Sequence, residues 1–142
     1  KKININLVLI GQGGETQKLK NLANQFKIKQ KVFFKKYNFN PLPFMKKAKL
    51  YVSFSDYEGQ PNAVIQSLGC GTQVLLKSFE GLDNKLKNNY NLTILNKLDE
   101  TKAEMIITKK IKIKRKKFFN TKIIKLFSEK QFADKILKLI YA

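Results

Sequence analysis

The sequence predicts an α/β fold in which helices cover both faces of a parallel sheet. Short apolar runs alternate with amphipathic stretches between residues 4 and 98, and the connections between them are short. Glycine and proline stand at the ends of several of these stretches. Such alternation is typical of a parallel sheet, because each parallel strand needs a crossover that a helix supplies. A chain of 142 residues is long enough for one such domain with its own core.

The first predicted elements are a strand, a helix and a second strand. Residues 5–10 have the sequence INLVLI, a buried strand that Gly11 ends. Residues 15–26 predict a helix, because their apolar side chains recur at helical spacing on one face: Leu19, Leu22, Ala23 and Phe26. Residues 31–34 (KVFF) predict the second strand.

Strands and helices continue to alternate up to residue 95. Residues 40–48 begin with Asn-Pro, a favourable helix start, and residues 61–68 predict the next helix. Gly69 and Gly71 bracket the end of that helix. The remaining segments are three strands and a weak helix: the strands LYVSF at 50–54, QVLL at 73–76 and LTIL at 92–95, with the helix at 81–86 before the last strand.

After Asp99 the pattern is helical. Helices are predicted at 99–107 and 118–127, and Ser128 caps a last helix with an apolar stripe of Phe132, Ile136, Leu139 and Ile140. We therefore expect a single domain over residues 1–142, with strands and helices at 4–98 and a helical C-terminal part at 99–142.

Composition excludes several classes of protein. Hydrophobic residues make up 43% of the chain, which argues against disorder. No apolar run approaches the roughly 18–20 residues of a membrane span, and the run LVLI is too short for a signal peptide. A single cysteine, Cys70, excludes an internal disulfide framework and a cysteine zinc site. The absence of histidine removes the commonest general base.

The net charge of +19 suggests a polyanionic partner. Arg115 is the only arginine, however, and the lysines are spread along the whole chain. Arginine is the usual residue for bidentate phosphate and base recognition, so lysine bias on solvated faces is favoured and no specific nucleic-acid partner is expected. Residues 109–117 (KKIKIKRKK) form the one real cluster, either a patch for a membrane surface or acidic partner, or a solvated and mobile linker.

Two loops follow predicted strands at positions that suit phosphate. The segment GQGGE at 11–15 opens a helix, although it lacks the third glycine of a dinucleotide fingerprint, and Lys35 and Lys36 stand where an acidic ribose ligand is expected. A tight turn alone would also explain these glycines. In the second loop, Glu58 and Gly59 precede a helix that Pro61 starts.

The second loop is the more informative. Free N–H groups of Asn62, Ala63 and Val64 would lie at the carboxyl edge of the sheet, where open α/β folds bind ligands. The alternative is that Glu58 is a solvated loop residue and the helix a packing helix. The residue pattern by itself leaves both interpretations open.

Several landmarks in order carry a family resemblance. They are LVLIGQGGE at 7–15, Val32 and Phe34 in a V-x-F strand, N-P-x-P at 40–43 with Ala48, S-x-x-E-G-x-P at 55–61, and GCGT at 69–72 followed by VLL. Over residues 7–95 the chain resembles the C-terminal, donor-binding domain of the retaining nucleotide-sugar glycosyltransferases of the GT-B fold, the group 1 or family-four enzymes. The resemblance implies a Rossmann-like sheet that here lacks its first strand and helix.

The resemblance also implies site residues. Glu58 matches the first glutamate of the family's Glu-x₇-Glu motif and would be the catalytic residue, lying against the donor sugar. Gln66 stands at the second glutamate, which contacts the ribose. The donor-binding residues would be Gly11, Gly13, Phe34, Lys35, Ser55, Gly59, Gln60, Pro61, Asn62, Ala63, Val64 and Gln66. No metal and no cofactor are expected besides the nucleotide-diphosphate sugar itself.

Other positions depart from the family pattern. They are Lys36 for glycine, Lys49 for aspartate, Ser67 for alanine and Gln73 for proline, and the glycine-rich acidic stretch is eroded at 79–91. Together with Gln66 they suggest a divergent or decaying enzyme.

The resemblance thus implies the donor-binding part of a hexosyltransferase that acts on a glycan or lipid-linked acceptor, as in polysaccharide, lipopolysaccharide or capsule synthesis. The chain would be a fragment, inactive alone, of a longer protein whose N-terminal acceptor domain is missing here. The location expected is cytoplasmic, peripheral to the inner face of an anionic membrane. The alternatives are an inactive glycosyltransferase domain and a basic module for nucleic acid or membranes.

Overall fold

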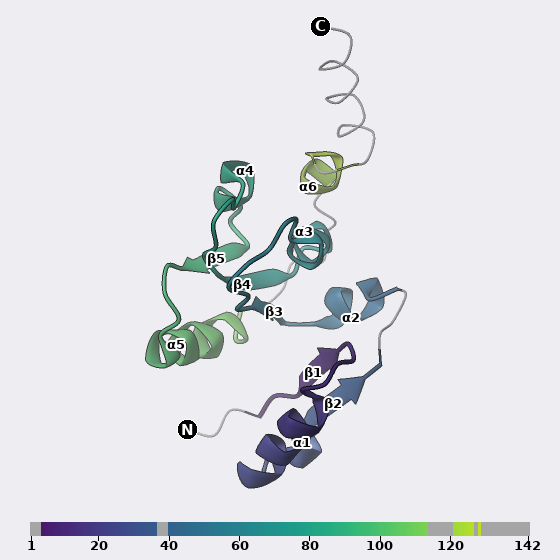
Figure 1. The fold of residues 1–142 in the computed structure, drawn as a ribbon. Coiled ribbons are helices and arrows are strands. Elements are labelled where there is room, and N and C mark those ends of the chain that lie inside the picture. The colour runs from purple at the N-terminus through teal and green to yellow at the C-terminus, as the bar shows by residue number, and fades with distance from the viewer. Residues whose placement is uncertain (1–3, 37–39, 114–120, 127, 129–142) are drawn as a thin grey trace, which may run out of the picture. The chain divides into compact units, whose positions relative to one another are not determined.

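The structure is a computed structural model that describes residues 4–36, 40–113, 121–126 and 128. Contacts within the chain divide it into two compact units, Lys1–Pro41 and Leu42–Ala142, and each is described by itself. Strands and helices alternate along the chain up to residue 110 (Figure 1).

The first unit is a β-α-β element. Strands β1 (Leu7–Ile10) and β2 (Val32–Lys35) pair in parallel, with Leu7 opposite Val32 and Ile10 opposite Lys35. Helix α1 (Thr16–Gln25) and the short 3-10 helix η1 (Lys29–Lys31) make the crossover between them. This is the connection that parallel pairing requires.

Helix α1 ends in a Schellman turn built on a lysine. The N–H of Lys27 donates to the carbonyl of Asn24, and the N–H of Ile28 donates to the carbonyl of Ala23, both over 2.9 Å. Lys27 has a φ of 55°, the left-handed conformation that glycine usually provides at this position. The turn lets the chain reverse from α1 into η1.

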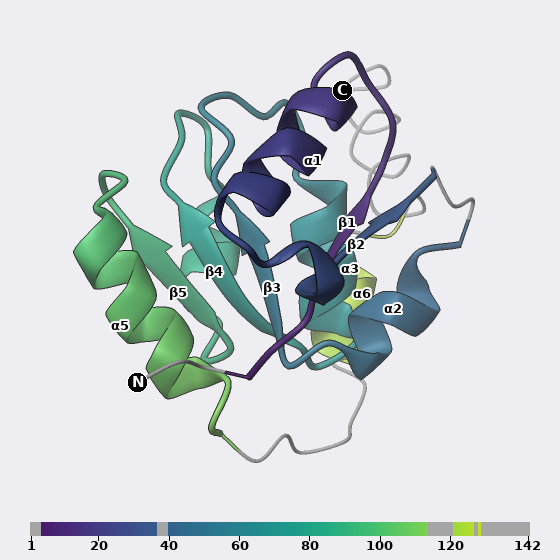
Figure 2. The same ribbon diagram turned by 90° about the horizontal axis from the view of Figure 1, so that it is seen from below.

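The second unit contains a three-stranded parallel sheet with the order β3-β4-β5. Its strands are Leu50–Ser53, Gln73–Lys77 and Leu92–Leu95, and Figure 2 shows β4 between the other two. Ser53 pairs with Leu76, and Lys77 pairs with Leu95. The helices of this unit are α2 (Leu42–Lys47), α3 (Asn62–Gly69), α4 (Asn84–Lys87), α5 (Glu100–Lys110) and α6 (Thr121–Leu126).

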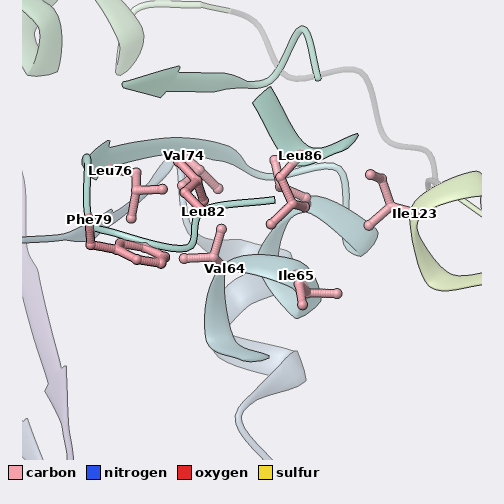
Figure 3. Packing of buried hydrophobic residues seen from close by; sticks show 9 residues of the cluster. Val64, Ile65, Val74, Leu76, Phe79, Leu82, Leu86 and Ile123 are labelled. Atoms are coloured by element: carbon pink, nitrogen blue, oxygen red, sulfur yellow. The ribbon is translucent and has the colours of Figure 1, made fainter. Parts of the chain in front are cut away.

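Helices cover both faces of this sheet. Val74 and Leu76 of β4 pack against α3, and α4 and α6 contribute Leu86 and Ile123 to the same core (Figure 3). Leu75 points to the other face and packs with Leu95 and with Ala103 of α5. Figure 1 accordingly shows α3 and α5 on opposite sides of the sheet. A middle strand buried on both faces explains why β4 is a continuous apolar run instead of an alternating one.

The predicted order of elements is confirmed from β1 to α5, and the segment predicted at 118–127 contains α6. The last predicted helix, with Phe132, Ile136, Leu139 and Ile140, lies outside the described residues. A single domain over residues 1–142 stays a prediction. Among the described helices, none is both long and apolar enough to cross a bilayer.

The first part of the lysine-rich cluster differs from the solvated, mobile linker offered as one interpretation of residues 109–117. Lys109 and Lys110 belong to helix α5, and Ile111, which follows the helix, is buried. Lys110 donates a hydrogen bond of 2.7 Å to Gln73 of β4. These contacts hold the first part of the cluster on the fold, so it is not a solvated linker there. Residues 114–117 lie outside the described residues.

Candidate functional site

The loop between β3 and α3 carries most of the candidate residues. It leaves the carboxyl end of β3, and because β3, β4 and β5 are parallel, their carboxyl ends share one edge of the sheet. Ser55 and Glu58 are partly buried in this loop, whereas Gly59 and Gln60 are exposed. The loop therefore presents a carboxylate at the edge where open α/β sheets bind ligands.

The amino end of α3 departs in one respect from the prediction of three free N–H groups. The N–H of Asn62 donates to the carbonyl of Gln60 over 2.8 Å, and the carbonyl of Pro61 accepts from Ile65 at 3.0 Å. Within the part of the chain that the structure describes, the N–H groups of Ala63 and Val64 have no acceptor. The side chain of Val64 is in the core, so this residue can meet a ligand only through its backbone.

Tyr51 of β3 feels the charge of Glu58, a relationship that the sequence analysis missed. Its side chain packs against the core beside α3 and shares a hydrogen bond with the Ser53 side chain. Burial raises the pKa of the Tyr51 hydroxyl, the negative charge of Glu58 raises it further, and the hydrogen bond with Ser53 lowers it. Residues 51 and 53 share one face of the strand, which was the only signal in the sequence.

An ion pair links the ends of two neighbouring strands. The Lys77 ammonium, at the last position of β4, donates to Oδ1 of Asp56 in the loop after β3. The side chain of Lys77 is only 19% exposed and that of Asp56 is 91% exposed. The sequence contains one signal for Lys77, a cation that ends an apolar strand, and the sequence analysis does not single this residue out.

The carboxyl end of α3 is fixed by the GCGT segment. Gly71 has a φ of 69° and its N–H donates to the carbonyl of Leu68 over 2.9 Å. The buried hydroxyl of Thr72 donates to the carbonyl of Met45 in α2 over 2.7 Å. Gln66, near this end of the helix, is exposed. These bonds fix the helix on which Gln66 lies.

The remaining candidates lie in the first unit. The N–H of Gly11 donates to the carbonyl of Lys35 over 3.0 Å, which joins the carboxyl ends of β1 and β2. The carbonyl of Gly13 accepts from the Thr16 hydroxyl at 2.8 Å, and the Lys20 ammonium lies 5.9 Å from the centre of the Phe34 ring. Gly11 and Lys35 are thus neighbours. The assembly of both groups of residues into one donor site stays a prediction, because they fall in different units.

Two open grooves stand out among the described residues, and Glu58 lines neither of them. One of about 410 Å³ lies in the first unit between α1 and β2 and includes Lys20 and Phe34. The other, of about 600 Å³, follows an exposed face of α5 around Met105. The loop of Glu58 is therefore identified by its chemistry and position and not by a closed cavity.

No group of three or more potential metal-binding side chains of the His, Cys, Asp or Glu type occurs within the described ranges. The expectation that no metal takes part stays a prediction.

Comparison with known proteins identifies relatives of this chain. Residues 1–118 match the family described as glycosyl transferases group 1. An uncharacterised glycosyltransferase of Methanocaldococcus jannaschii is 32% identical over 72 residues, which are 51% of this chain and 18% of that protein. The N-acetylgalactosamine-N,N'-diacetylbacillosaminyl-diphospho-undecaprenol 4-alpha-N-acetylgalactosaminyltransferase of Campylobacter jejuni is 30% identical over 74 residues, 52% of this chain and 20% of that protein.

A solved structure shares the fold. The crystal structure of WaaG, a glycosyltransferase involved in lipopolysaccharide biosynthesis, matches with a TM-score of 0.69 and 17% identity. The match covers 78% of this chain and 30% of WaaG, and it confirms the Rossmann-like α/β fold of a GT-B enzyme. The aligned part of the chain spans about a fifth of the length of either curated relative.

Proposed function

The chain belongs to the group 1 glycosyl transferases, and from this we propose that it is the donor-binding part of a retaining enzyme that uses a nucleotide-diphosphate sugar. The observation that carries the proposal is the loop after β3, where Glu58 is followed by a helix whose Ala63 and Val64 N–H groups have no acceptor among the described residues. A carboxylate accepts hydrogen bonds from sugar hydroxyls, and helix N-termini favour phosphate.

Each part of the site has a proposed role. Glu58 lies against the donor sugar, and Tyr51 of β3, which packs against the core, is the tyrosine whose pKa its charge raises. Backbone N–H groups at the start of α3 meet the diphosphate, and they stabilise the negative charge that develops as the nucleotide leaves. Gln66 reaches the ribose with an amide in place of a carboxylate.

The acceptor side of the proposal concerns the whole natural protein. The chain covers about a fifth of its curated relatives, so we assign acceptor binding to sequence that lies outside residues 1–142. The name of the Campylobacter jejuni relative includes a diphospho-undecaprenol acceptor, which supports a lipid-linked acceptor here. The lysine excess supports action at the inner, anionic face of a membrane.

Calorimetric titration of the natural full-length protein with UDP-, GDP- and ADP-sugars tests this proposal. Glu58→Gln should lower turnover by about 100-fold or more, a loss typical of a group that stabilises the transition state. Glu104→Gln changes an exposed carboxylate on α5 in the same way and should leave turnover unchanged. A folded full-length protein that binds none of these donors would exclude the proposal.

One observation favours a second candidate, an inactive domain of the same family. Besides Gln66, the family's alanine is replaced by Ser67, whose hydroxyl is buried without a hydrogen-bond partner among the described residues. Loss of selection for activity would permit both changes. Normal turnover of the unmodified full-length protein would exclude this candidate.

A further inference from the structure

Lys77 has an unusual environment for a lysine. It follows Val74, Leu75 and Leu76, which are fully buried, and its own side chain is four-fifths buried at the carboxyl end of the middle strand. Lysine is rarely buried this far unless its ammonium is paired, because desolvation of a charge is costly. Its position therefore calls for an anion at this edge of the sheet.

The anion that Lys77 meets in the structure is a weak and exchangeable partner. Asp56 comes from the neighbouring loop and its side chain is 91% exposed, so water competes for the carboxylate. Ion pairs with a solvated partner contribute little to stability. Asp56 also stands two positions before Glu58, so the pair lies on the loop of the candidate site.

Few other cations are available at this edge. Among the described loops that follow β3, β4 and β5, residues 54–61 contain no lysine, residues 78–83 contain none, and residues 96–99 contain Lys97. Lys97 is exposed and follows β5, which is not adjacent to β3. Lys77 is on the strand next to the loop of Glu58, where a diphosphate group would need positive charge.

We propose that Lys77 binds the diphosphate of the nucleotide donor and that Asp56 holds its ammonium only while the donor is absent. This inference rests on the proposed function. Donor phosphate, with its higher charge and several acceptor oxygens, displaces the Asp56 carboxylate and leaves it in solvent. Asp56 thus competes with the donor for Lys77. Removing the Lys77 charge should weaken donor binding, whereas removing the Asp56 charge should strengthen it.

The test measures affinities of the natural full-length protein for UDP, GDP and ADP and for the corresponding nucleosides by calorimetry. Lys77→Met, which keeps the apolar stem, should weaken nucleoside diphosphate binding about tenfold or more, the effect of losing one charged hydrogen bond. It should also reduce the salt dependence of nucleoside diphosphate binding, and it should leave nucleoside binding unchanged. Asp56→Asn should tighten diphosphate binding several-fold, and Lys77→Arg should retain most of it.

Two controls separate the role of Lys77 from a general loss of positive charge and from unfolding. Lys97→Met removes the exposed lysine of the same edge and should change affinity less than twofold. Thermal unfolding of each variant reports folding, and Lys77→Gln replaces Lys77→Met if the latter is unfolded.

Two results would overturn the inference while the proposed function stands. One is diphosphate binding that weakens equally in Lys77→Met and Asp56→Asn. An ion pair that only holds the loop in place predicts the same loss of affinity from both variants. The other is diphosphate binding by the unmodified protein that neither variant changes. A folded protein that binds no nucleoside diphosphate and no nucleotide sugar would instead overturn the proposed function and this inference together.

Discussion

The N–H of Thr72 donates to the carbonyl of Ser67 over 2.9 Å, which closes a Schellman turn at the end of α3. Both residues carry hydroxyl groups and both are fully buried. The Thr72 hydroxyl donates to the carbonyl of Met45, whereas the Ser67 hydroxyl has no partner within the described part of the chain. Two neighbouring hydroxyls therefore make opposite contributions to stability.

Ser67→Ala should stabilise the protein. It removes a buried unsatisfied hydroxyl, whose burial costs about 1–3 kcal/mol, and alanine is also the better helix former. We expect the free energy of unfolding to rise by about 1 kcal/mol in urea titrations. Thr72→Val is the matched control and should lower it by a similar amount, because the carbonyl of Met45 loses a donor. A loss of stability in Ser67→Ala would show that its hydroxyl is satisfied in solution.

Lys27→Gly should stabilise the first unit. Lys27 adopts the left-handed conformation at φ 55° in the turn after α1, which is unfavourable for a residue with a Cβ. Glycine relieves about 1 kcal/mol there. Lys27→Ala keeps the Cβ and should give no gain, and chemical denaturation of the two variants compares them. Equal stabilities would show that the turn relaxes without cost in the lysine protein.

Alkaline pH should destabilise the protein through Tyr51. Its pKa is raised in the folded state by burial and by Glu58, so the folded state holds the phenol proton more tightly than the unfolded state. The stabilisation that comes from this raised pKa is fully present below the unfolded pKa of about 10. It is lost as the pH rises from there through the folded pKa.

Denaturant titrations over this pH range provide the test. Tyr51→Phe should reduce the loss of stability, and Glu58→Gln should reduce it less, because burial is the larger cause. Tyr57→Phe changes a tyrosine that is 81% exposed and should leave the pH profile unchanged. Identical profiles for Tyr51→Phe and the unmodified protein would contradict the assignment.

Gln66→Glu should strengthen donor binding if the ribose lies where the proposed function places it. A charged hydrogen bond is roughly twice as strong as a neutral one, so affinity for the cognate nucleotide sugar should rise about fivefold. The gain should vanish with a 2′,3′-dideoxy nucleotide, which lacks the hydroxyls that the carboxylate would accept from. A gain that persists with the dideoxy analogue would place the ribose elsewhere.

Local periodicity predicted the order of strands and helices, because the strands are short apolar runs and the helices that flank the sheet each bury one face. The contacts within the candidate site could not be predicted in this way. Lys77 meets Asp56 because the parallel register sets Leu76 beside Ser53, so the two following segments leave the sheet together. That register is a long-range property that no local window of sequence contains.

The free N–H groups of α3 illustrate the same limit at short range. Helix geometry predicts unbonded donors at Asn62, Ala63 and Val64. The loop folds so that the carbonyl of Gln60 accepts from Asn62, which depends on the path of residues 54–61. The resemblance to the family located the loop, but its internal hydrogen bonds required the structure.

Gln73 shows that a departure from a family pattern can have a local structural role. Its amide donates to Oδ1 of Asn91 and its carbonyl oxygen accepts from Lys110, each over 2.7 Å. The side chain thereby joins β4 to the segment before β5 and to the last turn of α5. Proline, the family's usual residue here, provides none of these bonds.

Within the second unit, the middle strand β4 is paired on both sides and buried on both faces, and this has a consequence for local opening. Amide hydrogens in β4 should exchange with solvent long after those of β5, most of whose residues are only partly buried. Lys77 ends the strand that opens last, so little of the free energy of ligand binding is needed to order it.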